Sequence, residues 1–240
     1  MIKFFRKIRQ KTLTENKFGK YLTYAIGEII LVVIGILIAL SINNWNERRN
    51  QERALKNIYA MIADDLEQDI KKIEFVIKNK EKSELIFSRV LNNSMTKEDY
   101  EENPAATRII IGLTDLPLNT RGYYLLKEFR DIPKNDEDRL SSWILDFYQV
   151  QNKTLTADDQ VRMNDIENTV TDWKNNYSWY SDFITQDDNT NFIEYALNDQ
   201  DYKNKVANYY LLNYIIYKPV LNNYKEGATL LIKEIKARIN

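Results

Sequence analysis

Residues 25–42 read AIGEIILVVIGILIALSI, and the interpretation of the whole chain depends on this stretch. It is the only apolar run of membrane length in the sequence, and Glu28 is its only ionisable residue. Eighteen helical residues at about 1.5 Å each span roughly 27 Å, close to the ~30 Å hydrocarbon core of a bilayer. We therefore predict a transmembrane helix over residues 21–44.

The flanks of this run predict its orientation. Residues 1–20 carry seven basic side chains against the single acidic residue Glu15, and such a flank stays in the cytoplasm. The basic residues are Lys3, Arg6, Lys7, Arg9, Lys11, Lys17 and Lys20. We expect residues 1–20 to be cytoplasmic or interfacial and residues 45–240 to lie outside the cytoplasm. In a Gram-negative bacterium this places the anchor in the inner membrane and the C-terminal domain in the periplasm.

Two alternatives stay open for this end of the chain. Residues 29–40 also suit the apolar region of a secretory signal peptide, with Ala39-Leu40-Ser41 as a loose cleavage site. Residues 1–13 fit either a short helix lying on the anionic inner leaflet or a plain basic leader. The long leader, the carboxylate of Glu28 and the total apolar length favour an uncleaved anchor.

One face of the predicted membrane helix combines a carboxyl group with small residues. At about 100° per residue, the side chains on this face lie within about 40° of Glu28. With Glu28 itself, they are Tyr24, Val32, Gly35, Ala39 and Ile42. The small pair four residues apart lets two helices approach closely in lipid, and a carboxyl group at membrane depth needs a partner. We predict a helix–helix interface here. The alternatives are that Glu28 reaches the headgroups or serves in a proton relay.

The stretch YAIGEIILVVIGILIALSINNWNE, residues 24–47, resembles the N-terminal signature of an uncharacterised bacterial family of single-pass membrane proteins, a domain of unknown function. Residues 123–148, YYLLKEFRDIPKNDEDRLSSWILDFY, loosely resemble a second block of that family. The resemblance implies a membrane-anchored helical protein. It implies no activity, because the family has none assigned.

Composition and periodicity predict an all-α fold, with the membrane helix followed by an antiparallel helical bundle. Only 6 Gly and 4 Pro occur in 240 residues. Apolar spacings of three and four predict helices within residues 45–240. They run from Trp45 to about Asn92, over 119–129, from Pro133 to about Asn152, from Thr156 through a heptad stripe at Met163–Ile184, over Thr190–Asn198, and from Tyr210 onward with a kink at Pro219. Residues 108–113 remain open between helix and strand.

Candidate chemistry is sparse. The chain has no His and no Cys, which excludes nucleophiles, zinc sites and disulfides built on those residues. The Tyr and Trp residues between 173 and 224 are expected to pack in the core with their hydroxyls reaching the surface, rather than to line a ligand pocket. The acidic runs at 64–69, 136–138 and 187–188 are expected to be helix caps and solvated faces. We predict no catalytic, cofactor-binding or metal-binding residues.

Two classes of function remain from the sequence. The first is a non-enzymatic interaction, scaffold or sensory protein that self-associates through its membrane helix. The second is an accessory subunit of a membrane transport or ion-driven complex, in which Glu28 meets a group on another chain. The expected partners are the lipid bilayer and either a second copy or another membrane protein. The acidic body of the chain argues against nucleic acid.

Overall fold

The computed structural model describes residues 18–112, 116–129 and 139–239, with side chains from residue 22 onward. The chain divides into two units, Met1–Ala54 and Leu55–Asn240. Helix α2 (Phe18–Leu91) belongs to both. Its length follows from the sequence, because neither Gly nor Pro occurs between residues 36 and 91. The predicted helix end near Asn92 is confirmed.

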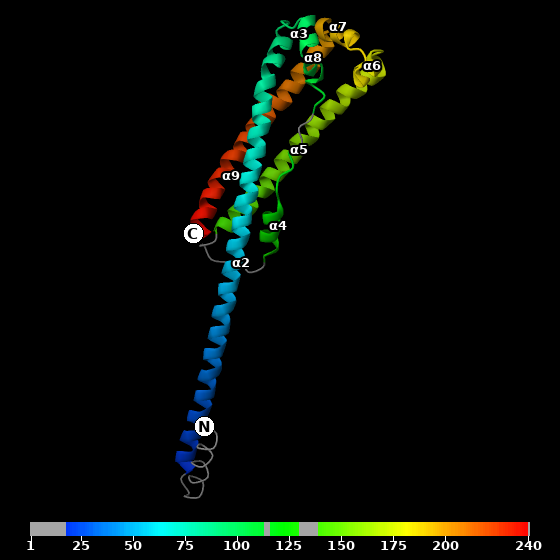
Figure 1. Ribbon diagram of the computed structural model, residues 1–240. Helices are drawn as coiled ribbons and strands as arrows, with labels where there is room; N and C mark the ends of the chain where they lie inside the picture. The colour runs from blue at the N-terminus through cyan, green and yellow to red at the C-terminus, as the bar shows by residue number, and fades with distance from the viewer. Residues whose placement is uncertain (1–17, 113–115, 130–138, 240) are drawn as a thin grey trace. The chain divides into compact units, whose positions relative to one another are not determined.

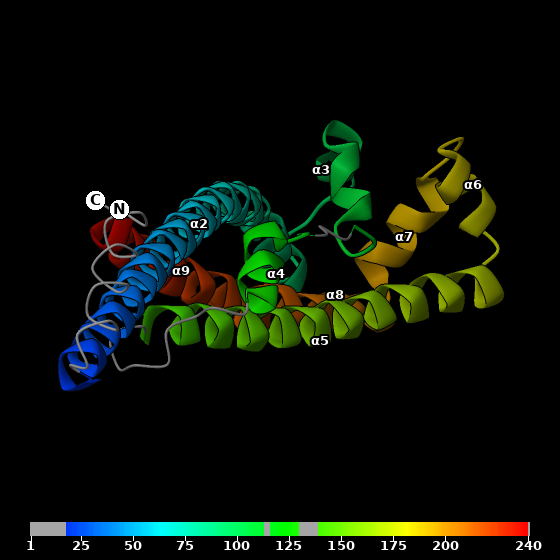
Figure 2. The same ribbon diagram turned by 90° about the horizontal axis from the view of Figure 1, so that it is seen from below.

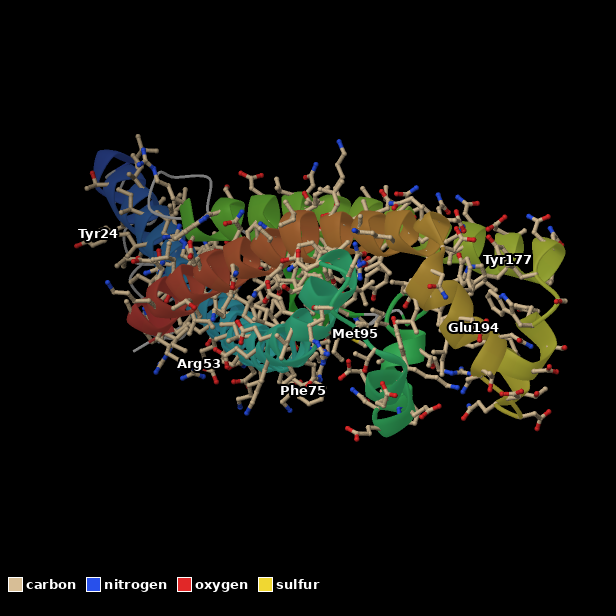
Figure 3. All side chains as sticks on the ribbon, turned by 90° about the horizontal axis from the view of Figure 1, so that it is seen from above. Tyr24, Arg53, Phe75, Met95, Tyr177 and Glu194 are labelled. Carbon is tan, nitrogen blue, oxygen red and sulfur yellow. The ribbon has the colours of Figure 1, made fainter. Side chains whose placement is uncertain are left out.

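In the first unit, α2 carries the apolar run on its surface. Every residue from 28 to 50 is exposed. Tyr24 is 61% exposed and projects from the helix (Figure 3). Among the described residues, one helix is long and apolar enough to cross a membrane, judged by length and composition.

The second unit is built on three long helical stretches (Figure 1). They are α2 from Leu55 onward, α5 (Arg139–Asn176), and the continuous run of α8 (Gln200–Tyr210), η3 (Leu211–Tyr217) and α9 (Lys218–Ile239). The hydroxyl groups of Tyr59 and Ser141 lie 2.7 Å apart. The part of α2 that belongs to this unit therefore starts at the same end of the bundle as α5. Lys56 donates to the Ile239 carbonyl at 3.2 Å, so the third run is antiparallel to both. The all-α bundle is confirmed, and no strand occurs in the described residues.

Short helices close this bundle. They are α3 (Lys97–Glu102), η1 (Pro104–Arg108), α4 (Arg121–Glu128), α6 (Tyr180–Thr185) and α7 (Thr190–Asn198). Within the bundle, α3, α6 and α7 gather at the end opposite the C-terminus (Figure 1). Helix α4 lies against α5 partway along it (Figure 2). The predictions of α4 and α7 are confirmed, α7 with the same bounds.

The core consists of two apolar clusters, one towards each end of the bundle. The first lies at the Leu55 end and includes Ile62, Leu126, Ile144, Tyr148, Leu221, Tyr224 and Leu231. The second lies at the α3–α7 end and includes Phe87, Trp173, Phe183, Phe192, Tyr202 and Val206. The expectation that the aromatic residues pack in the core is confirmed for these side chains. The expectation that their hydroxyls reach the surface is wrong for Tyr224, whose hydroxyl donates to buried Asp69 at 2.9 Å.

A buried carboxylate pair on α2 holds the start of α4. Asp69 accepts from the backbone N–H of Asn119 at 3.1 Å and from its side-chain Nδ2 at 2.9 Å. Asp65 accepts from the N–H of Gly122 at 2.9 Å. Both carboxylates are buried, and burial raises the pKa of Asp69. The prediction that this acidic run lies on a solvated face is therefore wrong for Asp65 and Asp69, whereas the predicted capping role is found. They satisfy orphan amides at the N-terminus of a different helix.

The expected break between two helices near Asn152 and Thr156 is wrong, because α5 runs unbroken from Arg139 to Asn176. No Gly or Pro interrupts it, and buried Leu155 carries the apolar stripe across the expected gap. The heptad stripe does not continue as one helix to Ile184 either. The chain turns after Asn176, and the Trp179 ring then packs on Trp173 with centroids 5.5 Å apart. The predicted helix start at Pro133 lies outside the described residues, as do the acidic residues 136–138.

The sequence predicts a kink at Pro219. In the structure, the helix widens just before this proline into the π-helical segment η3, which ends at Tyr217 and is followed directly by α9. Proline lacks the amide that an α-helix needs and crowds the carbonyl four residues earlier, so a wider turn ahead of it is favourable. Residues 108–113 contain no strand among those described. The 3₁₀ helix η1 ends at Arg108 and turns follow it.

We expect Gly122→Ala to destabilise the bundle by about 1–2 kcal/mol. A Cβ at this position would lie 2.5 Å from Ile62 Cγ1 and 3.0 Å from the Ile62 backbone nitrogen. Overpacking of about 1–3 kcal/mol exceeds the helix propensity that alanine gains over glycine, about 1 kcal/mol. Thermal unfolding of the full chain in detergent, followed by near-UV circular dichroism, measures the change. Gly112→Ala is the control, because no atom lies within 4 Å of its added Cβ. Equal melting of both variants would contradict close packing of α4 on α2.

Candidate functional site

The residues predicted to form a membrane interface all lie on α2 in the first unit. Tyr24, Glu28, Val32, Gly35 and Ala39 are exposed. A Cβ added to Gly35 would have no neighbour within 4 Å. This face is therefore open in the single chain, and its role as an interface stays a prediction. The basic residues Lys3, Arg6, Lys7, Arg9 and Lys11 lie outside the described residues.

A layer of polar side chains crosses the bundle between its two apolar clusters. We call Lys80 of α2, Arg162 of α5 and Asn213 of η3 the polar layer. Lys80 is 8% exposed, Arg162 is 2% exposed and Asn213 is 1% exposed. Two cations are thus buried together in one cross-section of the core, an arrangement that desolvation makes unfavourable.

One amide oxygen joins the two cations. Asn213 Oδ1 accepts from Lys80 Nζ at 3.0 Å and from Arg162 Nη1 at 3.3 Å. The Asn213 Nδ2 group donates to the Tyr209 carbonyl at 3.1 Å, which orients the amide with its oxygen towards the cations. A single neutral side chain therefore determines how α2 and α5 meet the third helical run at this level.

Aromatic rings also stabilise the two cations. The Arg162 guanidinium carbon lies 3.6 Å from the centroid of the Tyr217 ring, and Lys80 Nζ lies 5.3 Å from that of Tyr214. Both rings belong to η3. Asn213 and Tyr214 are adjacent in η3, and both are buried. The widened segment thus provides the amide and the rings together.

The two cations differ in their charge partners. Arg162 forms an ion pair with Asp159, one turn away on α5. Lys80 has no carboxylate ion-pair partner among the described residues. Burial, with a smaller contribution from the neighbouring Arg162 charge, lowers the pKa of Lys80 from 10.5 to about 8. Lys80 is therefore the buried cation whose charge is least compensated.

Two buried atoms beside the layer form no hydrogen bond within the described chain. They are Arg162 Nε and the Oδ2 atom of Asp158. Asp158 stands four residues before Arg162 on the same helix, and burial raises the pKa of its carboxyl group. The polar layer is thus incompletely hydrogen-bonded, which makes it easier to rearrange than the apolar clusters on either side.

The described residues contain no group of three or more Asp or Glu side chains that could hold a metal ion. The polar layer offers donors and positive charge, which do not suit a metal ion. No nucleophile and general base lie within hydrogen-bonding distance of each other in it. Its chemistry is that of a charged contact between helices.

The sequence analysis did not single out the polar layer, although the spacing contains a signal for it. Arg162 follows buried Leu155 by seven residues and precedes buried Ile166 by four, so it occupies a core position of α5. The predicted apolar stripe passes instead through Met163, which is 37% exposed. A charged residue at the position that a heptad assigns to the core is the pattern that predicts such a layer.

The fold is that of an all-helical bundle whose first helix carries an exposed apolar stretch. Residues 28–109 match a family of unknown function (DUF6090), which supports the resemblance as far as an uncharacterised domain. The match covers about one third of the chain and includes Glu28 and Lys80 but neither Arg162 nor the loosely similar block 123–148. No curated protein matches the chain, and no solved structure does.

We expect Lys80→Met to change how stability depends on pH. Below pH 8, Lys80 is protonated in both states, and the folded protein bears the cost of burying the charge. Between about pH 8 and 10.5, the folded protein releases this proton while the unfolded chain keeps it. The free energy of unfolding of the wild type should therefore rise with pH relative to the variant, on the order of 2–3 kcal/mol from pH 7 to 10.

Urea unfolding of both proteins at pH 7 and pH 10 measures this difference and cancels the titration of tyrosines, which both proteins share. Lys174→Met is the matched control, because Lys174 is exposed and should leave the pH profile unchanged. Parallel pH profiles for the wild type and Lys80→Met would show that the Lys80 charge is not destabilised by burial.

Proposed function

We propose that this chain is a membrane-anchored, non-enzymatic interaction or sensory protein whose helical bundle lies outside the cytoplasm. One observation carries the proposal. The most apolar 18-residue window of α2 has none of its residues buried within the protein. At about 25 cal/mol per Å² of exposed apolar surface, such a stretch is unfavourable in water and is stabilised in lipid. A soluble core helix would bury this surface against its own domain.

The charge distribution supports the orientation. The basic residues of positions 1–20 precede the apolar window, whereas Glu47, Arg48, Arg49, Glu52 and Arg53 after it carry mixed charge. The positive-inside rule then assigns the N-terminus to the cytoplasm and the bundle to the opposite side, the periplasm if the cell is Gram-negative. The bundle begins at Leu55, ten residues after Trp45, so only a short stretch separates it along the chain from the membrane.

The face of Tyr24, Glu28, Val32, Gly35 and Ala39 supports self-association. Glu28 is exposed and ionisable within an apolar surface, so a bilayer makes it costly unless a second helix covers it. Gly35 and Ala39 allow the backbone of that second helix to come close. A second copy of this chain provides the same face and can satisfy the carboxyl group of Glu28 by mutual hydrogen bonding.

The polar layer supports an interaction or sensory role rather than catalysis. It places an uncompensated charge where three helices meet, and a small movement of one helix changes its hydrogen bonds. A bundle that transmits binding at one end needs such a cross-section, in which two arrangements differ by a few kcal/mol. The same layer has no pair of groups suited to general acid–base chemistry.

Topology is tested with single cysteines, because the chain has none of its own. Ser178→Cys places a thiol on the exposed turn after α5, and Thr12→Cys places one in the basic flank. In spheroplasts, a membrane-impermeant maleimide should label the first variant and label the second only after lysis. Labelling in the reverse pattern contradicts the orientation. A shortened, soluble chain would show that the apolar segment is a cleaved signal peptide.

Self-association is tested on the full chain in mild detergent by sedimentation equilibrium. We expect Gly35→Leu to weaken association at least about tenfold, because its side chain fills the space through which the helices approach. Gly27→Leu is the matched control, since residue 27 lies about 100° from Glu28 around the helix. Equal effects of the two substitutions on association would contradict an interface on the face of Glu28, Gly35 and Ala39.

Glu28→Gln separates the second class of function from the first. An accessory subunit of an ion-driven complex is favoured if this variant assembles normally but loses a phenotype that depends on the proton-motive force. Self-association alone is favoured if Gly35→Leu prevents assembly and Glu28→Gln has no further consequence. Co-purification of a multi-pass membrane protein with the wild type would also support the accessory role.

A further inference from the structure

At the end of the bundle where α2 gives way to α3, a cavity of about 280 Å³ adjoins the second apolar cluster. Val90 and Met95 line one side of it, and Ala196 and Leu197 at the end of α7 line the other (Met95 is labelled in Figure 3). The remaining lining side chains are polar and belong to Asn93, Tyr100, Asn198, Asp199, Gln200 and Lys203. The volume lies just below the ~300 Å³ at which pockets for drug-sized molecules begin.

The wall formed by the end of α2 is held rigidly. The N–H groups of Asn93 and Ser94 donate to the carbonyls of Val90 and Arg89 at 3.1 and 2.9 Å, which closes the helix with a left-handed residue. That residue is Asn93, with φ of 53°. Arg89 pairs with Asp99, and Thr96 caps α3, so the turn is fixed from both sides. The Asn93 side chain is therefore presented to the cavity by a preorganised backbone.

Several polar side chains that line the cavity form a hydrogen bond within the protein through one of their polar atoms and leave a second polar atom without a protein partner. Lys203 Nζ donates to Asn93 Oδ1 at 3.1 Å, and Gln200 Nε2 donates to Asn204 Oδ1 at 3.0 Å. Asp199 Oδ1 accepts from the N–H of Asp201 at 2.9 Å. Asn93 Nδ2, Gln200 Oε1 and Asp199 Oδ2 then have no partner among the described residues. The cavity thus offers both donors and acceptors that their own hydrogen bonds hold in position.

Tyr100 is 1% exposed and lines the cavity with its buried side chain. Its hydroxyl is fully buried beside that of Tyr202, and burial raises the pKa of both hydroxyl groups. Because these two hydroxyls are withdrawn from solvent, the groups that the cavity offers to a ligand are the exposed amide, carboxylate and ammonium groups of its other lining residues.

We propose that this cavity binds a small, uncharged polyhydroxy molecule of monosaccharide size. Hydroxyl groups both donate and accept, so they match a lining that mixes free amide, carboxylate and ammonium groups. The charges of Lys203 and Asp199 cancel, so a ligand with net charge would remain uncompensated. The apolar side chains of Val90 and Met95 on one side and of Leu197 on the other suit the C–H faces of a sugar ring.

The proposal rests on the sensory form of the proposed function and names its ligand class, but its test does not depend on membrane anchoring.

The test is saturation-transfer NMR and titration calorimetry on the full chain in detergent, with a panel of free hexoses and pentoses. At least one sugar should bind. Asn93→Gly should weaken that binding about tenfold, because glycine retains the left-handed turn and removes only the amide. Lys203→Met should do the same, whereas Lys174→Met, at an exposed lysine outside the cavity, should bind as the wild type does.

Absence of binding by every sugar at millimolar concentration overturns the proposal. So does binding that Asn93→Gly and Lys203→Met leave unchanged, or preferential binding of free amino acids or inorganic phosphate used as charged probes. Sugar binding by a chain that fails the topology test would retain the ligand site and remove only the membrane-anchored function. Correct topology without sugar binding would do the reverse.

Discussion

The bundle depends on a shared hydrogen bond acceptor buried where its three long helices meet. Asn213 Oδ1 receives hydrogen bonds from Lys80 and Arg162, and those two cations come from different helices. Two buried charges of the same sign repel and lose hydration, so the layer costs free energy that the apolar clusters must offset. In return, the layer opposes a full-turn slip of one helix along another, because such a shift would leave both cations without their acceptor. The polar layer thus contributes more to the relative position of the three helices along their axes than to the stability of the fold.

The contact between the buried carboxylates of α2 and the start of α4 also depends on hydrogen bonds to buried polar groups. Asp65 and Asp69 would be unfavourable in the core of α2 if nothing donated to them, and the first amides of α4 would be equally unfavourable without acceptors. The carboxylates accept hydrogen bonds from the amides, so both are satisfied. This contact holds the start of α4, which lies between α3 and α5 in the chain, against α2. Gly122 then matters because a hydrogen bond of 2.9 Å to Asp65 requires the two backbones to approach more closely than a Cβ allows.

The helical class, the end of α2 and the bounds of α7 could be predicted from local sequence, because periodicity and the placement of breakers determine them. The buried carboxylates of α2 could not, since burial of Asp69 depends on a donor fifty residues away at Asn119. The continuity of α5 was missed because Thr156 and the acids after it suit a helix start equally well. The π-helical segment was missed for a related reason. Pro219 predicts a distortion, but tertiary contacts of Asn213 and Tyr214 decide its form. The predicted face around Glu28 lies on the surface of a single chain, so one copy cannot show its partner.

The arrangement along the bundle favours communication between its two ends. The cavity adjoins the second apolar cluster through Val90 and Tyr100, and the first cluster contains Leu55, where the bundle begins. The polar layer lies between the two clusters. Close-packed apolar clusters move as units, because they are nearly incompressible. Relative movement of the clusters must therefore be taken up at the polar layer, where Arg162 Nε and Asp158 Oδ2 have spare hydrogen-bonding capacity and the π-helical turn can rewind. A ligand that contacts both Val90 of α2 and Lys203 of α8 would bias that layer by shifting the two helices relative to each other. Helix α2 then leads from the layer back to Leu55.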